Sequence, residues 1–256
     1  MKLQVKEYIP RSWWHPIGAS ILCKEFSART PSLCNAVTIC FTIDKSKFRN
    51  PACAWAAGVD RTVSVDLHSG QIQGFFNVPV DHLTATPVLA DYLLRHGTSD
   101  LVMVSPDAGR VRVAERFSQL LGSDLAFVAK RRPRGSLNEV EALNVVGEVA
   151  GRRCVVIDDI IDTAGTVCAA AELLMDHGAT EVWAMATHPV LSDPALVRLN
   201  KSAISRVVVT NTLPLPEERR IDKIEVLSVA RIIADAIDAV FEDTSVSEIF
   251  GGHNLT

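Results

Sequence analysis

The sequence predicts an α/β protein in which a parallel sheet is covered by helices on both faces, a three-layer arrangement. Three observations carry this prediction. From residue 59 onward, strand-like segments alternate with helix-like segments. Several of the strand-like segments are short apolar runs, which are typical of strands buried on both faces. The helical segments have recognisable start and stop signals and are long enough to connect parallel strands.

Seven strands are expected after residue 59, at Arg61–Leu67, Asp100–Ser105, Leu125–Ala129, Arg153–Ile157, Glu181–Thr187, Arg206–Thr210 and Ile224–Leu227. A basic loop, Lys130–Gly135, is expected to follow the third of them.

Helices are expected between these strands. The first opens at Thr86-Pro87, an N-cap followed by a first-turn proline, and ends at Gly97. The second carries apolar residues at helical spacing and stops at Gly122; these residues are Val113, Ala114, Phe117, Leu120 and Leu121. The third covers Thr166–His177 and is closed by Gly178, and the last covers Val229–Phe241.

The first 55 residues differ in composition from the rest of the chain. They hold four of the six cysteines and three of the four tryptophans. They also carry eight basic and three acidic residues, a net charge of +5, which leaves −9 for the remainder of a chain whose total is −4. Only Ala36–Ile43 is expected to form a strand there. We therefore predict a boundary of some kind near residue 56.

The composition argues against several classes of partner. A net charge of −4 gives no reason to expect nucleic acid or an anionic membrane. No apolar run reaches the roughly 18 residues that a membrane helix needs. The N-terminus lacks a secretory signal, and the six cysteines fit no zinc-binding spacing. We expect a cytoplasmic protein with free thiols.

The segment Val155–Thr166, VVIDDIIDTAGT, is the strongest functional signal. An apolar strand ends at Asp158-Asp159, and a turn containing Asp162, Thr163, Ala164, Gly165 and Thr166 leads into a helix. The helix N-terminus offers backbone N–H groups to a phosphate, and the paired carboxylates can accept hydrogen bonds from sugar hydroxyls. A capped helix after a buried strand is the simpler alternative. A P-loop and a dinucleotide fingerprint are both absent from the sequence.

This loop resembles the phosphoribosyl-binding motif of the type I phosphoribosyltransferase fold. Three further segments resemble the ribose-phosphate diphosphokinases, which make 5-phosphoribosyl 1-diphosphate (PRPP): Val65–Phe76, Val104–Gly109 and Ala129–Glu141. Thr187–Ala195 and Ser245–Phe250 also fit. The resemblance covers about residues 56–251. It implies an incomplete domain of this type at residues 1–83, a phosphoribosyltransferase-like domain at 84–241, and a C-terminal tail at 242–256.

The resemblance implies a reaction and a set of site residues. The enzymes transfer diphosphate from Mg-ATP to ribose 5-phosphate for nucleotide biosynthesis. Ribose 5-phosphate would bind at Asp158, Asp159 and the loop Asp162–Thr166. His68 and Asp107 would be magnesium ligands, and Lys130 and Arg132 would close over the transferring phosphates. Regulatory positions would be Gln73, Asp81, Ser245 and Ser247, with His82 standing where many members have Asn.

The resemblance does not extend to residues 1–55, which lack the family's adenine- and ATP-binding segments. Either this is an alternative N-terminus, or a truncation or frameshift has replaced the original one. We therefore expect ribose 5-phosphate binding with weak or absent ATP binding.

A ribose-phosphate diphosphokinase of this kind would form homo- or hetero-oligomers. Two alternatives to this function stay open. One is a non-catalytic subunit that associates with full-length PRPP synthetase. The other is a phosphoribosyltransferase that consumes PRPP, although it would not need VDLHSGQIQGFF or SVSEIF.

Overall fold

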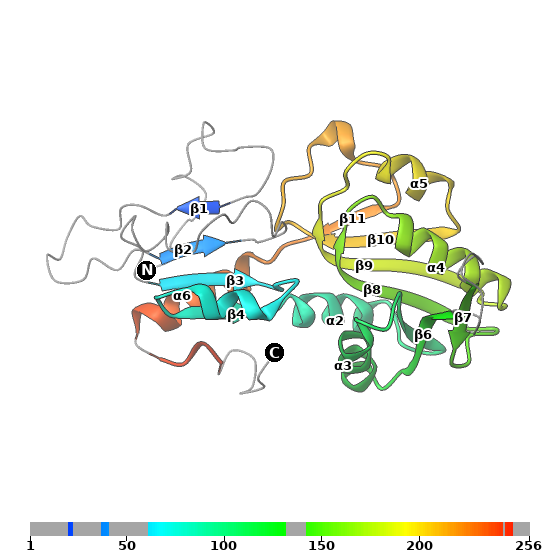
Figure 1. The fold of residues 1–256 in the computed structure, drawn as a ribbon, viewed down its shortest axis with the longest axis horizontal. Coiled ribbons are helices and arrows are strands. Elements are labelled where there is room, and N and C mark those ends of the chain that lie inside the picture. Colours follow the sequence, from blue (N-terminus) through cyan, green and yellow to red (C-terminus); the bar gives the residue numbers. More distant parts are fainter. Residues whose placement is uncertain (1–19, 23–36, 41–60, 132–141, 243, 248–256) are drawn as a thin grey trace, which may run out of the picture. The chain divides into compact units, whose positions relative to one another are not determined.

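The fold was analysed in a computed structural model, which describes residues 20–22, 37–40, 61–131, 142–242 and 244–247 (Figure 1). The chain divides into two compact units, with the division between Leu83 and Thr84.

The first unit contains a four-stranded sheet in the order β1-β2-β3-β4. β1 (Ser20–Leu22) runs antiparallel to β2 (Val37–Cys40), whereas β3 (Arg61–Val65) runs parallel to both β2 and β4 (Val80–Leu83). β2 confirms the strand expected within residues 36–43. A 3-10 helix, η3 (Gly70–Phe75), lies between β3 and β4 and was not predicted.

The second unit contains a seven-stranded sheet in the order β11-β10-β9-β8-β5-β6-β7. Its strands are β5 (Leu101–Ser105), β6 (Asp124–Arg131), β7 (Ala142–Val146), β8 (Arg153–Ile161), β9 (Glu181–Pro189), β10 (Ile204–Thr210) and β11 (Ile224–Leu227). All neighbouring pairs are parallel except β6 and β7, which are antiparallel. The α/β prediction is confirmed, with this one edge strand as the exception to a parallel sheet.

Helices cover both faces of the second sheet (Figure 1). α2 (Thr86–Arg95) and α3 (Val111–Leu121) lie on one face, and α4 (Gly165–Asp176) and α5 (Ala195–Lys201) lie on the other. α6 (Ala230–Phe241) is the last helix, and η4 (Glu217–Arg219) is a short 3-10 turn. The predicted helices are thus present, whereas α5 was not predicted. Thr86, expected as an N-cap, is the first residue of α2 instead.

The buried core explains why the strands read as continuous apolar runs. Val102 and Val104 of β5 belong to the cluster that includes Ala171 and Leu174 of α4. Because successive side chains on a strand point to opposite faces, the intervening Met103 lies on the other face, and it is also fully buried. Among the described residues, no helix is long and apolar enough to cross a membrane.

Candidate ribose-phosphate site

The strand order of the second unit creates a switch point between β5 and β8. From β5 the chain passes through α3 to β6 on one side, and it later returns to β8 on the other side of β5. Ligands of open α/β sheets bind beyond the carboxyl ends of the strands at such a point, where the connecting loops diverge. The loops after β5 and β8 carry most of the residues predicted to form the site.

Asp158 and Asp159 lie within β8 rather than beyond it. The strand was expected to end at Ile157, but it continues to Ile161 because it stays paired with β9. Its pairing with β5 stops earlier, at Val156 opposite Val104. The two aspartates therefore occupy the part of β8 that extends past its partner at the switch point.

Arg110, at the start of α3, pairs with both aspartates. Its Nη2 donates to Asp159 Oδ2 at 2.5 Å, and its Nε lies 3.6 Å from Asp158 Oδ1. The side chain of Arg110 is 18% exposed, that of Asp158 15% and that of Asp159 9%. The backbone N–H of Asp159 also donates to Asp158 Oδ1 at 2.9 Å. Sequence reasoning missed Arg110, because 48 residues separate it from Asp158.

The close approach of two carboxyl groups affects their ionisation. Burial raises the pKa of Asp158 to about 7, and the hydrogen bond to Asp159 and the negative charge of Asp159 act in the same direction. The positive charge of Arg110 acts in the opposite direction. The carboxyl group of Asp158 thus changes charge near neutral pH.

The segment after β8 turns directly into α4. Ala164 has φ 59° and ψ 10°, a left-handed conformation that is uncommon for a residue other than glycine, and it precedes the first helical residue, Gly165. Asp162, Thr163 and Thr166 are exposed. The helix N-terminus is therefore accessible, and its backbone N–H groups suit a phosphate.

Arg198 of α5 contacts this loop and was not singled out from the sequence. Its Nη1 donates to the carbonyl oxygen of Thr163 at 3.0 Å. A Cβ added at Gly165 would lie 3.3 Å from the same nitrogen. The absence of a side chain at residue 165 thus leaves room for Arg198 beside the helix start.

Asp107 follows β5 and shapes the turn that leads to α3. Its Oδ1 accepts hydrogen bonds from the backbone N–H groups of Gly109 at 2.8 Å and Arg110 at 3.1 Å. Ser105 Oγ donates to its carbonyl oxygen at 2.6 Å. Asp107 therefore shapes this turn, and it holds the backbone of Arg110, the residue that pairs with Asp158 and Asp159.

His68 belongs to the first unit, where the prediction for the end of β3 needs correction. The strand ends at Val65, and Asp66 has φ 42°. The strand expected over Arg61–Leu67 therefore stops two residues early, and His68 does not directly follow a strand. His68 is exposed. Between Asp66 and His68, the backbone N–H of Leu67 donates to His82 Nε2 at 2.9 Å.

The four predicted regulatory residues are divided between the two units. Gln73 lies in η3 and donates to the carbonyl oxygen of Gly70 at 3.2 Å. Asp81 of β4 accepts two hydrogen bonds from Arg61, at 2.5 Å and 2.9 Å. Ser245 and Ser247, in the second unit, are exposed and lie 2.7 Å apart through their Oγ atoms.

One of the two predicted phosphate-closing residues, Lys130, lies in β6. Lys130 was expected in a loop, but the strand continues through Arg131, and Lys130 pairs with Leu143 of β7. Arg132 lies outside the described residues.

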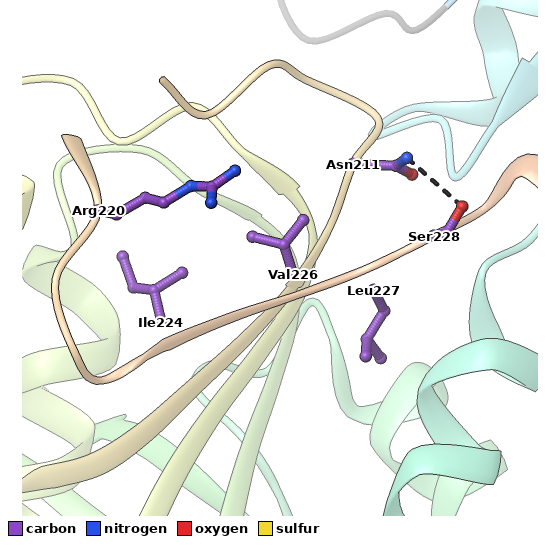
Figure 2. A pocket seen from close by; sticks show the side chains of 6 residues that line it. All are labelled: Asn211, Arg220, Ile224, Val226, Leu227 and Ser228. Carbon is purple, nitrogen blue, oxygen red and sulfur yellow. Dashed lines mark hydrogen bonds between the residues drawn. The ribbon is translucent and has the colours of Figure 1, made fainter. Parts of the chain in front are cut away.

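An open hollow of about 330 Å³ lies elsewhere in the second unit, at the edge formed by β10 and β11 (Figure 2). It is lined by Asn211, Arg220, Ile224, Val226, Leu227 and Ser228. None of these residues carries a carboxylate, and β9 and β10 separate β11 from the switch-point strand β8. The hollow is therefore separate from the carboxylates at the switch point.

A largely parallel sheet between two helical layers, with paired aspartates and a D-T-A-G-T turn at its switch point, defines a protein of the type I phosphoribosyltransferase fold. Residues 122–251 match the model of the phosphoribosyl synthetase-associated domain family. The crystal structure of phosphoribosylpyrophosphate synthetase from Mycobacterium smegmatis is similar, with a TM-score of 0.68 and 46% identity over 78% of this chain and 67% of that one.

Curated relatives agree with this likeness. A ribose-phosphate pyrophosphokinase of Caldanaerobacter subterraneus subsp. tengcongensis is 50% identical over 214 residues, covering 80% of this chain and 67% of the relative. That of Streptomyces coelicolor is 56% identical over 195 residues, covering 76% of this chain and 60% of the relative. The chain therefore belongs to the ribose-phosphate pyrophosphokinase family, and it spans about 60 to 67% of the length of these relatives.

Proposed function

We propose that the chain binds ribose 5-phosphate at the carboxyl ends of β5 and β8 and acts as a ribose-phosphate diphosphokinase. The reaction transfers diphosphate from Mg-ATP to the C1 hydroxyl of the sugar and yields PRPP. The observation that carries this proposal is the adjacency of two nearly buried carboxylates to an accessible helix N-terminus, on a chain about half identical to ribose-phosphate pyrophosphokinases.

The sugar phosphate would use both parts of this arrangement. Its phosphate would accept hydrogen bonds from the backbone N–H groups of residues 163–166 and from the hydroxyls of Thr163 and Thr166. Its vicinal ribose hydroxyls would donate to Asp158 and Asp159. Because the loop leads from one group to the other, a single ligand can reach both.

Magnesium would be shared between the protein and the ATP phosphates. Among the described residues, no group of three His, Cys, Asp or Glu side chains is arranged to hold a metal ion. Magnesium is commonly held by one or two protein ligands together with substrate phosphates and water, so a single carboxylate such as Asp107 would be enough on the protein side of the second unit. When bound, the ion would neutralise the charge that develops on the transferring group.

The remaining contribution is positive charge over the transferring phosphates. Lys130 and Arg132 would supply it, and closure of this segment would exclude water and strengthen the contacts. The ATP half of the reaction would lack part of its binding site, because residues 1–55 have no sequences resembling the family's adenine- and ATP-binding segments. We therefore propose sugar-phosphate binding with weak or absent ATP binding.

Isothermal titration tests both parts. We expect ribose 5-phosphate to bind the intact chain in the absence of ATP, and Asp159→Asn to weaken that binding by about tenfold, as loss of a charged hydrogen-bond acceptor usually does. An exposed control, Asp176→Asn at the end of α4, should bind normally. Absence of ribose 5-phosphate binding would overturn the proposed function, and normal turnover with tight ATP binding would overturn the weak-ATP part.

A second candidate function follows from the same feature of residues 1–55. A chain that binds the sugar phosphate but not ATP could act as a non-catalytic subunit within an oligomer of full-length synthetase. Co-expression with a full-length relative tests this. Co-purification with altered activity of that relative would support it, and a separate elution of the two chains with unchanged activity would contradict it.

A further inference from the structure

Arg110 is held in place through both its backbone N–H and its guanidinium group. Its backbone N–H donates to Asp107 Oδ1 at 3.1 Å. Its guanidinium group reaches across the switch point to Asp159 Oδ2 at 2.5 Å and lies 3.6 Å from Asp158. One residue thus connects the turn after β5 to the carboxylates of β8.

The two carboxylates need such a partner if both are to accept hydrogen bonds. They are consecutive in the chain, and both are largely removed from solvent. Two negative charges in such a place repel each other, and a nearby positive charge offsets that repulsion. A guanidinium group is well suited to this because its donors are arranged in a rigid plane that can serve two carboxylates at once.

We propose that Arg110 is a positioning residue that holds Asp158 and Asp159 in the orientations in which they accept the vicinal hydroxyls of the sugar. The ligand this arrangement selects is a sugar phosphate that carries both hydroxyls. The inference rests on the proposed function, since it concerns the same site.

A positioning role for Arg110 and direct binding of the phosphate by Arg110 would affect ligand affinity differently. A direct anion contact would contribute equally to any sugar phosphate. A positioning role through the carboxylates contributes only where the hydroxyls are present. The comparison of ribose 5-phosphate with 2-deoxyribose 5-phosphate distinguishes the two roles, because the deoxy sugar retains the phosphate and loses one of the vicinal hydroxyls.

The experiment measures the affinities of both sugar phosphates by isothermal titration, using the full chain and its variants. Arg110→Gln should weaken ribose 5-phosphate binding by about tenfold while affecting the deoxy sugar much less, so that the preference between the two largely disappears. Arg110→Lys should restore part of the preference, because it keeps the charge but not the planar pair of donors. Arg112→Gln is the matched control, since Arg112 is exposed on the same helix, and it should retain the wild-type preference.

A double variant tests whether Arg110 acts through the carboxylates. In the Asp159→Asn background, Arg110→Gln should cause little further loss of preference, because the group it positions is already altered. Additive losses, or an equal loss of affinity for both sugars, would overturn the positioning role.

Failure of the proposed function gives a different result. In that case the wild-type chain binds neither sugar phosphate, and both proposals are overturned. A wild-type chain that binds ribose 5-phosphate, with an unchanged preference in Arg110→Gln and Arg110→Lys, overturns the positioning role alone. Thermal unfolding of each variant checks that it is folded, and Arg110→Lys provides the comparison if Arg110→Gln unfolds.

Discussion

Arg198 Nη1 donates to the carbonyl oxygen of Thr163 at 3.0 Å, so a residue of α5 holds the loop that precedes α4. The bond joins segments 35 residues apart and places a positive charge beside the proposed phosphate position. The loop therefore depends on a helix that has no sequence motif of its own.

The first prediction concerns this contact. Arg198→Met should weaken ribose 5-phosphate binding by about three- to tenfold, because the loop loses a hydrogen bond from a charged donor and the phosphate loses a nearby cation. Isothermal titration at low ionic strength measures the effect. Lys201→Met, an exposed lysine on the same helix, is the control. Equal affinities for the Arg198 variant and the wild type would contradict the prediction.

The second prediction concerns the pH dependence of sugar binding. The pKa of Asp158 is raised to about 7, so below that pH its carboxyl group is protonated and accepts hydrogen bonds less well. Ribose 5-phosphate affinity should therefore rise as the pH increases from about 6 to 8. The phosphate of the ligand also gains charge near pH 6, which Asp158→Asn controls for. An identical pH profile in the variant would show that Asp158 is not responsible.

The raised pKa of Asp158 also makes folding stability depend on pH, in the opposite direction to sugar binding. A carboxyl group whose pKa is higher in the folded chain than in the unfolded chain binds more protons when folded. Its contribution to the free energy of unfolding is therefore largest at low pH and decreases as the pH rises from about 4 to 7. Asp158→Asn should remove this part of the pH dependence in denaturant titrations.

The third prediction concerns His82 in the first unit. His82 Nε2 accepts the N–H of Leu67, so the ring is neutral with its proton on Nδ1. Burial lowers the pKa of His82, although the charge of Asp66 acts in the opposite direction. Because the pKa is below the unfolded value, the stabilisation is present above about pH 6.5 and is lost as the pH falls through the folded pKa.

Two measurements check the role of His82. NMR titration of its imidazole should give a pKa below about 6.5. His82→Asn can still accept the Leu67 N–H through its amide oxygen, so it should make unfolding of this unit less dependent on pH, whereas His82→Ala should destabilise the unit at every pH. A normal histidine titration in the wild type would refute the prediction.

The fourth prediction concerns Lys223, whose ammonium group donates to three carbonyl oxygens at the C-terminal end of α5: Leu199 at 3.1 Å, Asn200 at 3.3 Å and Ser202 at 3.1 Å. A cation at this end also interacts favourably with the helix dipole. Lys223→Met should lower the free energy of unfolding by about 1–2 kcal/mol. Chemical denaturation measures this, and Lys201→Met should change it by less than about 0.5 kcal/mol.

Errors in the sequence-based boundaries have a common cause. The strand containing Val155–Ile157 was expected to end before Asp158, and Lys130 was expected in a loop, because charged residues usually mark the end of a buried strand. In the fold, the backbone of each residue still pairs with a neighbouring strand. Similarly, the strand expected to end at Leu67 ends two residues earlier, at Val65, because Asp66 has a positive φ.

The sequence by itself determined the class of fold and the D-D and D-T-A-G-T elements of the site, because apolar periodicity and turn chemistry are local properties. Only the tertiary structure decided that β5 and β8 are neighbours, which brings Arg110 to Asp158 and Asp159 and forms the switch point. Arg198 reaches Thr163 for the same reason. Strand order depends on pairing between segments about 50 residues apart, and a contact at that separation leaves no periodic signal in the chain.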